Sequence, residues 1–259
     1  MDFNLKKYYY KFFDTAKYKE YKSNKLVEKS IKIFEEKFKD YLYGIERKIK
    51  DNNKITFLHS GHLGDLIYAL PVIKELSKSH ECHFYIQANK KLNVNYFKHP
   101  AKGVFIDERM LKLFLPLMKA QKFIHKCEKY NGEEIDINFD IFRELPVNIH
   151  FNSPRWYFHI SGIQVDLKDP YMDVEPHEKI KNRIVLHRTF RHRNQFINYK
   201  FLSDYKNLIF IGTNDEYLDL KKDVKNLEIY VCKDYLDMAR VIKSSKFFIL
   251  FSRSLFATR

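Results

Sequence analysis

Residues 55–79, ITFLHSGHLGDLIYALPVIKELSKS, decide the fold of this chain. A β-rich apolar run over residues 55–58 leads into a loop that carries Gly61 and Gly64, and an apolar pattern of helical period follows. This order predicts a strand, a tight turn and a helix. In an α/β sheet such a turn presents backbone N–H groups and the positive end of a helix dipole, which attract an anionic ligand or an acidic side chain. Asp65 stands at that point.

Apolar runs of strand length recur on both sides of a stretch broken by prolines. A second strand at residues 82–86 completes a βαβ unit, which requires a parallel sheet and a right-handed crossover. The other predicted strands are residues 104–106, 135–142, 184–186, 208–211, 227–231 and 247–251, and the other predicted helices include residues 110–129 and 234–244. This is the pattern of βα repeats. We therefore predict an α/β protein with two parallel-sheet halves and a ligand cleft at the carboxyl ends of the strands.

The prolines between residues 144 and 182 mark the boundary between the halves. We divide the chain into an N-terminal helical extension over residues 1–54, a first domain over residues 55–175 and a second domain over residues 176–259.

The N-terminal extension has the pattern of an amphipathic helix. Its apolar residues recur at three- and four-residue steps, at Val27, Ile31, Phe34, Phe38, Leu42, Ile45 and Ile49. Its other face carries Lys29, Lys32, Lys37, Lys39 and Lys48. We interpret it as a helix that packs its apolar stripe on the domain and leaves its basic face in solvent. The alternative is peripheral contact with the inner face of a membrane, because Tyr and Phe beside Lys suit that interface.

Composition favours a globular, cytoplasmic protein with an acidic partner. Hydrophobic residues make up 45% of the chain, but no apolar run reaches the roughly 18 residues of a bilayer span, and the N-terminus lacks the apolar core of a signal peptide. The net charge of +14 favours nucleic acid, an anionic membrane or phosphorylated small molecules. Cys82, Cys127 and Cys232 show no disulfide or zinc-ligand spacing, so we expect reduced thiols and no metal.

A basic loop directly after the predicted strand 184–186 is the second informative stretch. Residues 187–194 read HRTFRHRN, with Arg188, Arg191 and Arg193 close together. Guanidinium groups bind phosphate oxygens through paired donors, so a diphosphate is a natural ligand. The alternatives are a solvated basic loop and a nucleic-acid patch.

Two further positions have both a structural and a functional interpretation. Gly212 follows another strand and lets the backbone approach a ligand, although a plain turn explains it equally well. Asp65 is either a helix N-cap or a general base that faces the cleft. The loop beside it has little steric bulk, which a substrate requires; its residues are Ser60, Gly61, His62 and Gly64. Neither GxxxxGK[ST] nor GxGxxG is present, which disfavours a P-loop ATPase and an ordinary NAD enzyme.

Three stretches together resemble a known family. Residues 60–73, SGHLGDLIYALPVI, resemble the N-terminal motif of glycosyltransferase family 9, the ADP-heptose:lipopolysaccharide heptosyltransferase family. The loop 187–194 and the turn at Gly212 are similar to that family's donor-phosphate loop and its next strand–glycine turn. Residues 237–248, DMARVIKSSKFF, resemble its following helix and strand. The resemblance covers roughly residues 55–90 and 183–256.

The resemblance implies a GT-B architecture of two Rossmann-like domains that face a cleft. It also implies an inverting, metal-independent sugar transfer from a nucleotide-diphosphate donor to a glycan or glycolipid acceptor, with no other cofactor. By position, Asp65 is the general base. The residues that hold the diphosphate are Arg188, Thr189, Arg191 and Arg193, and Gly212 lies near the nucleotide. Ser60, Gly61, His62 and Gly64 form the acceptor-side loop.

The C-terminal part departs from the family pattern. Residues 250–256, LFSRSLF, stand where the family has an acidic-Thr-Gly turn and a Ser-His helix. The second sheet requires roughly 60 to 80 further residues to be complete, so we expect a truncated second domain. A strand over residues 247–251 is then expected to leave apolar surface and an open edge. These departures keep two alternatives open, a catalytically inactive nucleotide- or anion-binding relative and, more weakly, a basic nucleic-acid-binding protein.

Overall fold

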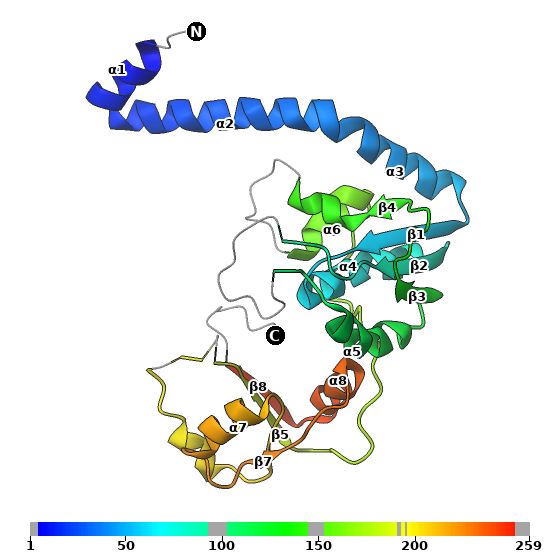
Figure 1. Ribbon diagram of the computed structural model, residues 1–259, viewed down its shortest axis with the longest axis vertical. Helices are drawn as coiled ribbons and strands as arrows, with labels where there is room; N and C mark the ends of the chain where they lie inside the picture. The colour runs from blue at the N-terminus through cyan, green and yellow to red at the C-terminus, as the bar shows by residue number, and fades with distance from the viewer. Residues whose placement is uncertain (1–4, 93–102, 145–152, 191–192, 195, 252–259) are drawn as a thin grey trace. The chain divides into compact units, whose positions relative to one another are not determined.

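The computed structural model describes residues 5–92, 103–144, 153–190, 193–194 and 196–251. The chain divides into two compact units, residues 1–87 with 130–169 and residues 88–129 with 170–259. The sequence-based division instead places residues 88–129 and 170–175 in the first domain and separates residues 1–54 as an extension. The described part of the chain contains two four-stranded sheets with helices, which confirms the predicted α/β class with two parallel sheets. Each unit is described by itself below (Figure 1).

The first sheet has the strand order β3-β2-β1-β4. Its strands are β1 (Lys54–His59), β2 (Glu81–Ile86), β3 (Lys126–Lys129) and β4 (Ile137–Asn138). Strand β1 pairs in parallel with both β2 and β4. Helix α4 (Leu63–Leu76) connects β1 to β2, so the predicted strand–turn–helix at residues 55–79 is confirmed. The β1 side chains are almost all buried, and Phe57 stacks on Phe139 with ring centroids 5.3 Å apart.

The second sheet has the order β7-β6-β5-β8, with all pairings parallel. Its strands are β5 (Ile184–Arg188), β6 (Leu208–Phe210), β7 (Glu228–Ile229) and β8 (Phe247–Phe251). Helices α7 (Asn214–Lys221) and α8 (Tyr235–Ser244) and the 3-10 helix η2 (Tyr199–Asp204) belong to the same unit. Apolar clusters that include Leu186, Phe210 and Leu220 form its core.

Three predictions for the middle of the chain are wrong. Residues 104–106 form no strand, since Val104 makes only an isolated bridge with Lys91. The predicted helix 110–129 is α5 (Glu108–Lys119), followed by strand β3. The predicted strand 135–142 shortens to β4 and continues as the 3-10 helix η1 (Phe139–Arg143). The reason is local, because the Asn138 side chain accepts the backbone N–H of Asp140 and starts a turn.

Strand β8 lies at an edge of the second sheet in the described part of the chain. Phe247 is 58% exposed and Leu250 is 54% exposed. This agrees with the expectation of apolar surface at residues 247–251. The departure from the family pattern at residues 252–256 lies outside the described residues.

The N-terminal extension forms three consecutive helices, α1 (Leu5–Phe13), α2 (Thr15–Lys37) and α3 (Lys39–Asp51) (Figure 1). Only α3 behaves as predicted, because it contacts α6 (Ser153–Ser161) and buries Ile45. No residue of α2, all of which the structure describes, is buried. The prediction of one stripe packed on the domain is therefore wrong for α2. Among the described helices, none has the length and apolar character of a bilayer span.

Replacing the same residue type in α2 and in α3 tests this difference. We expect Ile45→Ala to lower the free energy of unfolding by about 2–4 kcal/mol, because Ile45 is 1% exposed and truncation leaves a cavity. Ile31→Ala is the matched control, since Ile31 is 52% exposed, and its effect should stay within about 0.5 kcal/mol. Urea unfolding followed by circular dichroism measures both. Equal losses for the two variants would show that α2 packs as α3 does.

Candidate functional site

The loop between β1 and α4 carries the acid that the sequence singles out. Helix α4 begins at Leu63, with His62 as its N-cap, so Asp65 is the third residue of the helix and not the cap itself. Its carboxylate accepts the backbone N–H of His62 at 3.2 Å. The side chain of Asp65 remains 28% exposed. Asp65 thus has a capping function and still presents an oxygen to solvent.

A buried carboxylate, Asp140, organises the floor of this loop. Its Oδ1 accepts the backbone N–H of Ser60 at 2.9 Å, and its Oδ2 accepts the Ser60 hydroxyl. Arg143 donates through Nη1 to Oδ1 at 2.7 Å. Asp140 is only 3% exposed, so these donors replace water around the charge.

His59 extends the same cluster into the core. Its Nδ1 lies 3.0 Å from Asp140 Oδ1 and its Nε2 lies 2.9 Å from the Tyr157 hydroxyl. The backbone N–H of Gly61 also points at Nδ1 at 3.0 Å, but a carboxylate only accepts hydrogen bonds, so we assign the proton to Nδ1. Tyr157 then donates to Nε2. Burial raises the pKa of Tyr157 above its ordinary value, and the negative charge of Asp65 adds to that rise, so the phenol stays protonated.

Arg143 joins the buried acid to the exposed one. Its Nη2 lies 3.1 Å from Asp65 Oδ2, while Nη1 holds Asp140. The guanidinium also lies over the ring of Phe142, 4.3 Å from its centroid. One planar cation therefore fixes the distance and orientation between two carboxylates.

Only glycine fits at position 61, because the surrounding side chains leave no room for a Cβ atom. A Cβ there would lie 2.5 Å from Cε1 of His59 and 2.9 Å from Cβ of Asp65, and it would also clash with Arg143. Gly64 has no such constraint, because nothing lies within 4 Å of a Cβ built there. Of the four predicted acceptor-side loop residues, Ser60 is fully buried against Asp140 and does not face solvent.

The arrangement supports proton transfer at an exposed carboxylate. Asp65 sits at the carboxyl end of a parallel strand, where α/β proteins bind ligands. Its charge is complemented by Arg143 and by the first turn of α4. Within the described residues, no group of three His, Cys, Asp or Glu side chains is arranged to hold a metal ion.

The predicted phosphate-binding loop lies in the second unit, and the two arginines of it that the structure describes, Arg188 and Arg193, are already paired. Arg188 is 3% exposed, and its Nη2 donates to Asp219 Oδ2 at 2.5 Å. Arg193 Nη1 donates to the same oxygen at 3.0 Å. Arg188 also lies over Tyr199, 5.0 Å from the ring centroid, and its Nε is the buried side-chain nitrogen without a hydrogen-bond partner in the described part of the chain.

In this arrangement Arg188 supports packing, and a phosphate contact requires Asp219 to release it. Thr189 and Arg193 are half-buried, whereas Arg191 lies outside the described residues. The roles predicted for these residues therefore stay predictions.

Glu216 ties the arginine loop to the turn at Gly212. Its Oε1 accepts the backbone N–H of Phe190 at 3.1 Å, and its Oε2 accepts the Thr213 hydroxyl at 2.8 Å. Gly212 has φ +153°, and a Cβ there would lie 2.8 Å from the ring of Phe210. Two loops at the carboxyl ends of β5 and β6 are thereby held together by one buried acid.

Asp219 has a perturbed carboxyl group. Burial alone would raise its pKa, but the hydrogen bond from Arg188, with the charges of Arg188, Arg193 and Lys222, lowers the pKa below its ordinary value. The paired, ionised form is therefore the stable one at neutral pH.

The sequence indicated Asp65 and the arginine loop, but it missed the residues that hold them. A signal existed for Asp140 and Arg143, because both end a predicted strand and the carboxyl ends of parallel strands lie at one edge of a sheet. His59, Tyr157 and Asp219 gave none, since their contacts depend on tertiary packing.

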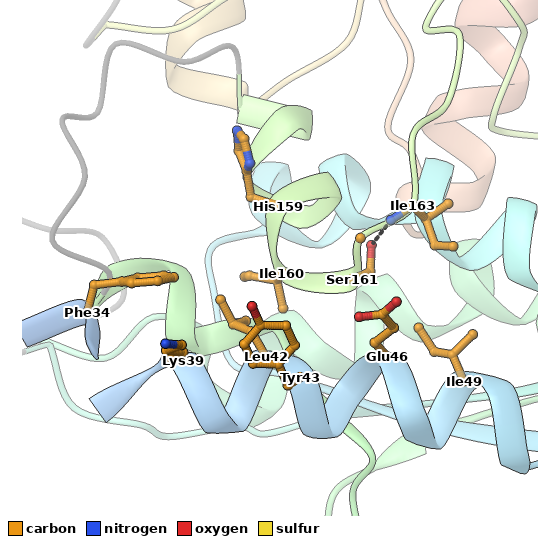
Figure 2. A pocket seen from close by; sticks show the side chains of 11 residues that line it. Phe34, Lys39, Leu42, Tyr43, Glu46, Ile49, His159, Ile160, Ser161 and Ile163 are labelled. Atoms are coloured by element: carbon orange, nitrogen blue, oxygen red, sulfur yellow. Dashed lines mark hydrogen bonds between the residues drawn. The ribbon is translucent and has the colours of Figure 1, made fainter. Parts of the chain in front are cut away.

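A cavity of about 530 Å³ lies elsewhere in the first unit (Figure 2). Figure 2 shows side chains of α3 on one side and the end of α6 on the other. Its lining residues are Phe34, Lys39, Leu42, Tyr43, Glu46, Ile49, His159, Ile160, Ser161, Gly162 and Ile163. The catalytic, donor-binding and acceptor-side residues predicted from the sequence are not among them.

Two glycines of the same loop give a matched test of the site geometry. Gly61→Ala should destabilise the protein by about 1–3 kcal/mol, because the new methyl group overlaps His59 and Asp65. Gly64→Ala should be neutral or stabilise by about 0.5–1 kcal/mol, since the position is helical and open. Thermal and urea unfolding measure both. A harmless Gly61→Ala would contradict the described packing.

Removing Asp219 tests the ion pair of the second unit. Asp219→Asn leaves Arg188 buried without its counter-charge and should cost about 3 kcal/mol at pH 7. Because the pKa of Asp219 is lowered from 3.8, its contribution is present above that value and is lost as the pH falls through the lowered pKa. The difference from wild type should thus shrink below about pH 4. Asp215→Asn, on the exposed side of α7, is the control. A pH-independent difference would overturn the assignment.

No protein-family model and no curated protein matches this chain. Among solved structures, the chain is similar to E. coli heptosyltransferase WaaC with ADP-2-deoxy-2-fluoro heptose, at a TM-score of 0.40 and 11% sequence identity. The match covers 76% of this chain and 82% of that one. We base no functional inference on a likeness of this size.

Proposed function

We propose that this protein is an inverting glycosyltransferase that moves a sugar from a nucleotide-diphosphate donor to a glycan or lipid-linked acceptor. The observation that carries the proposal is Asp65, a partly exposed carboxylate in the first turn of α4, directly after β1, whose orientation is fixed by His62 and Arg143. The motif resemblance at residues 60–73 supports the same role.

In the proposed reaction Asp65 accepts the proton of an acceptor hydroxyl. The hydroxyl oxygen forms a bond to the anomeric carbon of the sugar, while the bond from that carbon to the diphosphate breaks with inversion. The nucleoside diphosphate leaves with its added negative charge. Cationic and hydroxyl groups of the loop 187–194 stabilise that charge, with Arg193 and Thr189 as the half-buried candidates. No metal enters this scheme.

Arg143 has a positioning role in this proposal. It holds Asp65 at 3.1 Å and is itself held by buried Asp140 at 2.7 Å. The geometry of the base therefore depends on a residue 78 positions away in the chain. A fixed base is effective because proton transfer requires hydrogen-bond contact with the acceptor hydroxyl.

A second candidate function is binding without turnover. It is favoured by Arg188, which is buried and paired with Asp219 rather than open to a phosphate. In that case the protein holds a nucleotide or another anion through the remaining loop groups.

The test of the proposed function uses a panel of nucleotide sugars, with calorimetry for binding and nucleoside-diphosphate release for turnover. Asp65→Asn should leave folding and donor binding intact and lower transfer by about 100-fold or more. Glu75→Gln, also on α4, is the control and should leave both unchanged. Arg143→Lys keeps the charge but loses the paired contact, and it should lower turnover more than binding.

Three other outcomes separate the candidates. Full activity of Asp65→Asn would remove Asp65 from the mechanism. Binding without release in the wild type would favour the second function. Steeply salt-dependent binding to generic DNA or RNA, with no nucleotide-sugar binding, would favour a nucleic-acid-binding protein.

A further inference from the structure

Helix α1 exposes an unusual number of aromatic side chains. Tyr9 is 60% exposed, Phe12 is 73% exposed and Phe13 is 78% exposed. Tyr8 is 42% exposed. Pairs four residues apart, Tyr8 with Phe12 and Tyr9 with Phe13, lie on neighbouring rows of one helix face, and the rings of Tyr9 and Phe13 are 5.3 Å apart. The four rings thus form one exposed aromatic face.

The rest of this helix and the start of the next are strongly basic. Helix α1 contains no acidic residue. Lys7 and Lys11 lie one turn apart beside the aromatic face, with their Nζ atoms 5.7 Å from the ring centroid of Tyr8 and 5.9 Å from that of Phe12. Residues 5–25 contain seven lysines and two acidic residues. The lysines are Lys6, Lys7, Lys11, Lys17, Lys19, Lys22 and Lys25.

Packing within the first unit does not cover these residues. Helix α2 is described along its whole length and buries no residue, whereas Phe38, the N-cap of α3, and Ile45 within α3 are buried. Of the N-terminal helices, α3 therefore packs on the unit, whereas α1 and the first half of α2 expose their side chains to solvent.

We propose that residues 5–25 form a docking surface for an anionic membrane. Tyr and Phe rings insert at the boundary between head groups and acyl chains, and neighbouring lysines pair with anionic head groups. The two features occur together on α1, where an aromatic face is bordered by lysines. This surface is separate from the candidate site at Asp65, and the proposal does not depend on the proposed function.

The distribution of charge favours an anionic membrane over a groove on another protein as the binding partner. The positive charges are spread over residues 5–25 on side chains that are almost all exposed, which fits an extended layer of negative charge better than a discrete set of acidic partners. The exposed aromatic face supplies the apolar contact that a purely electrostatic partner would not need.

Vesicle co-sedimentation with the full chain tests the proposal. Vesicles of phosphatidylcholine alone are compared with vesicles that also contain phosphatidylglycerol. We expect binding to the anionic vesicles, at least tenfold weaker binding to the neutral ones, and a decrease with added salt. No binding, or equal binding to both kinds of vesicle, would overturn the proposal.

Two variants separate the aromatic from the basic contribution. The double substitution Phe12→Ala with Phe13→Ala should weaken binding by about tenfold or more. Leu26→Ala with Val27→Ala, an exposed apolar pair outside the surface, is the control and should have no effect. Replacing Lys6, Lys7 and Lys11 by Gln should weaken binding by about 100-fold and reduce its salt dependence.

Because the substituted side chains are exposed, we expect every variant to remain folded. Circular dichroism spectra of the variants check this. An unchanged affinity in both variants would contradict the proposal. So would salt-dependent binding to single-stranded nucleic acid that exceeds vesicle binding, because stacked aromatic rings beside lysines would then serve that partner.

Discussion

The charge of Asp140 is the interaction on which the first unit's candidate site depends. An ionised carboxylate that is 3% exposed requires donors from the protein, because an unpaired buried charge costs several kcal/mol. Ser60, His59 and Arg143 supply them. Satisfying this one group therefore brings the end of β1 against η1 and directs the other half of the Arg143 guanidinium to Asp65. The position of exposed Asp65 therefore depends on the hydrogen bonds that stabilise buried Asp140, because Arg143 contacts both carboxylates.

The second unit also contains a buried charge that requires a partner, but there the signs of the buried and exposed charges are exchanged. There the buried charge is a cation, Arg188, and the partly exposed partner is an acid, Asp219. Glu216 then holds the arginine loop against the turn at Gly212. In the first unit the counter-charge of Asp140 is Arg143, three residues away, whereas in the second unit Arg188 pairs with Asp219, 31 residues away. This pairing orders the loops at which parallel sheets bind ligands, and in the second unit it also occupies guanidinium donors that a phosphate would need.

The sequence predicted what short-range patterns determine. The strand–turn–helix at residues 55–79 and the strands near β5 and β6 follow from local apolar periodicity, and Asp65 follows from its place in that turn. The partner of Asp65 was not predictable from such local patterns, because Arg143, held by Asp140, reaches Asp65 only after β4 pairs with β1. Likewise, periodicity gave an apolar stripe on α2, but it carries no information on whether a partner covers that stripe.

Amide hydrogen exchange in native protein and in Asp140→Ala tests the central claim most directly. If the Asp140 carboxylate holds the loop, the Ser60 amide should be strongly protected in the native protein, and its protection should fall by at least about tenfold relative to the Phe57 amide in the variant, which corresponds to about 1.4 kcal/mol. Phe57 lies in β1 and reports any general loss of stability. Equal changes at Ser60 and Phe57, or none at Ser60, would contradict the account.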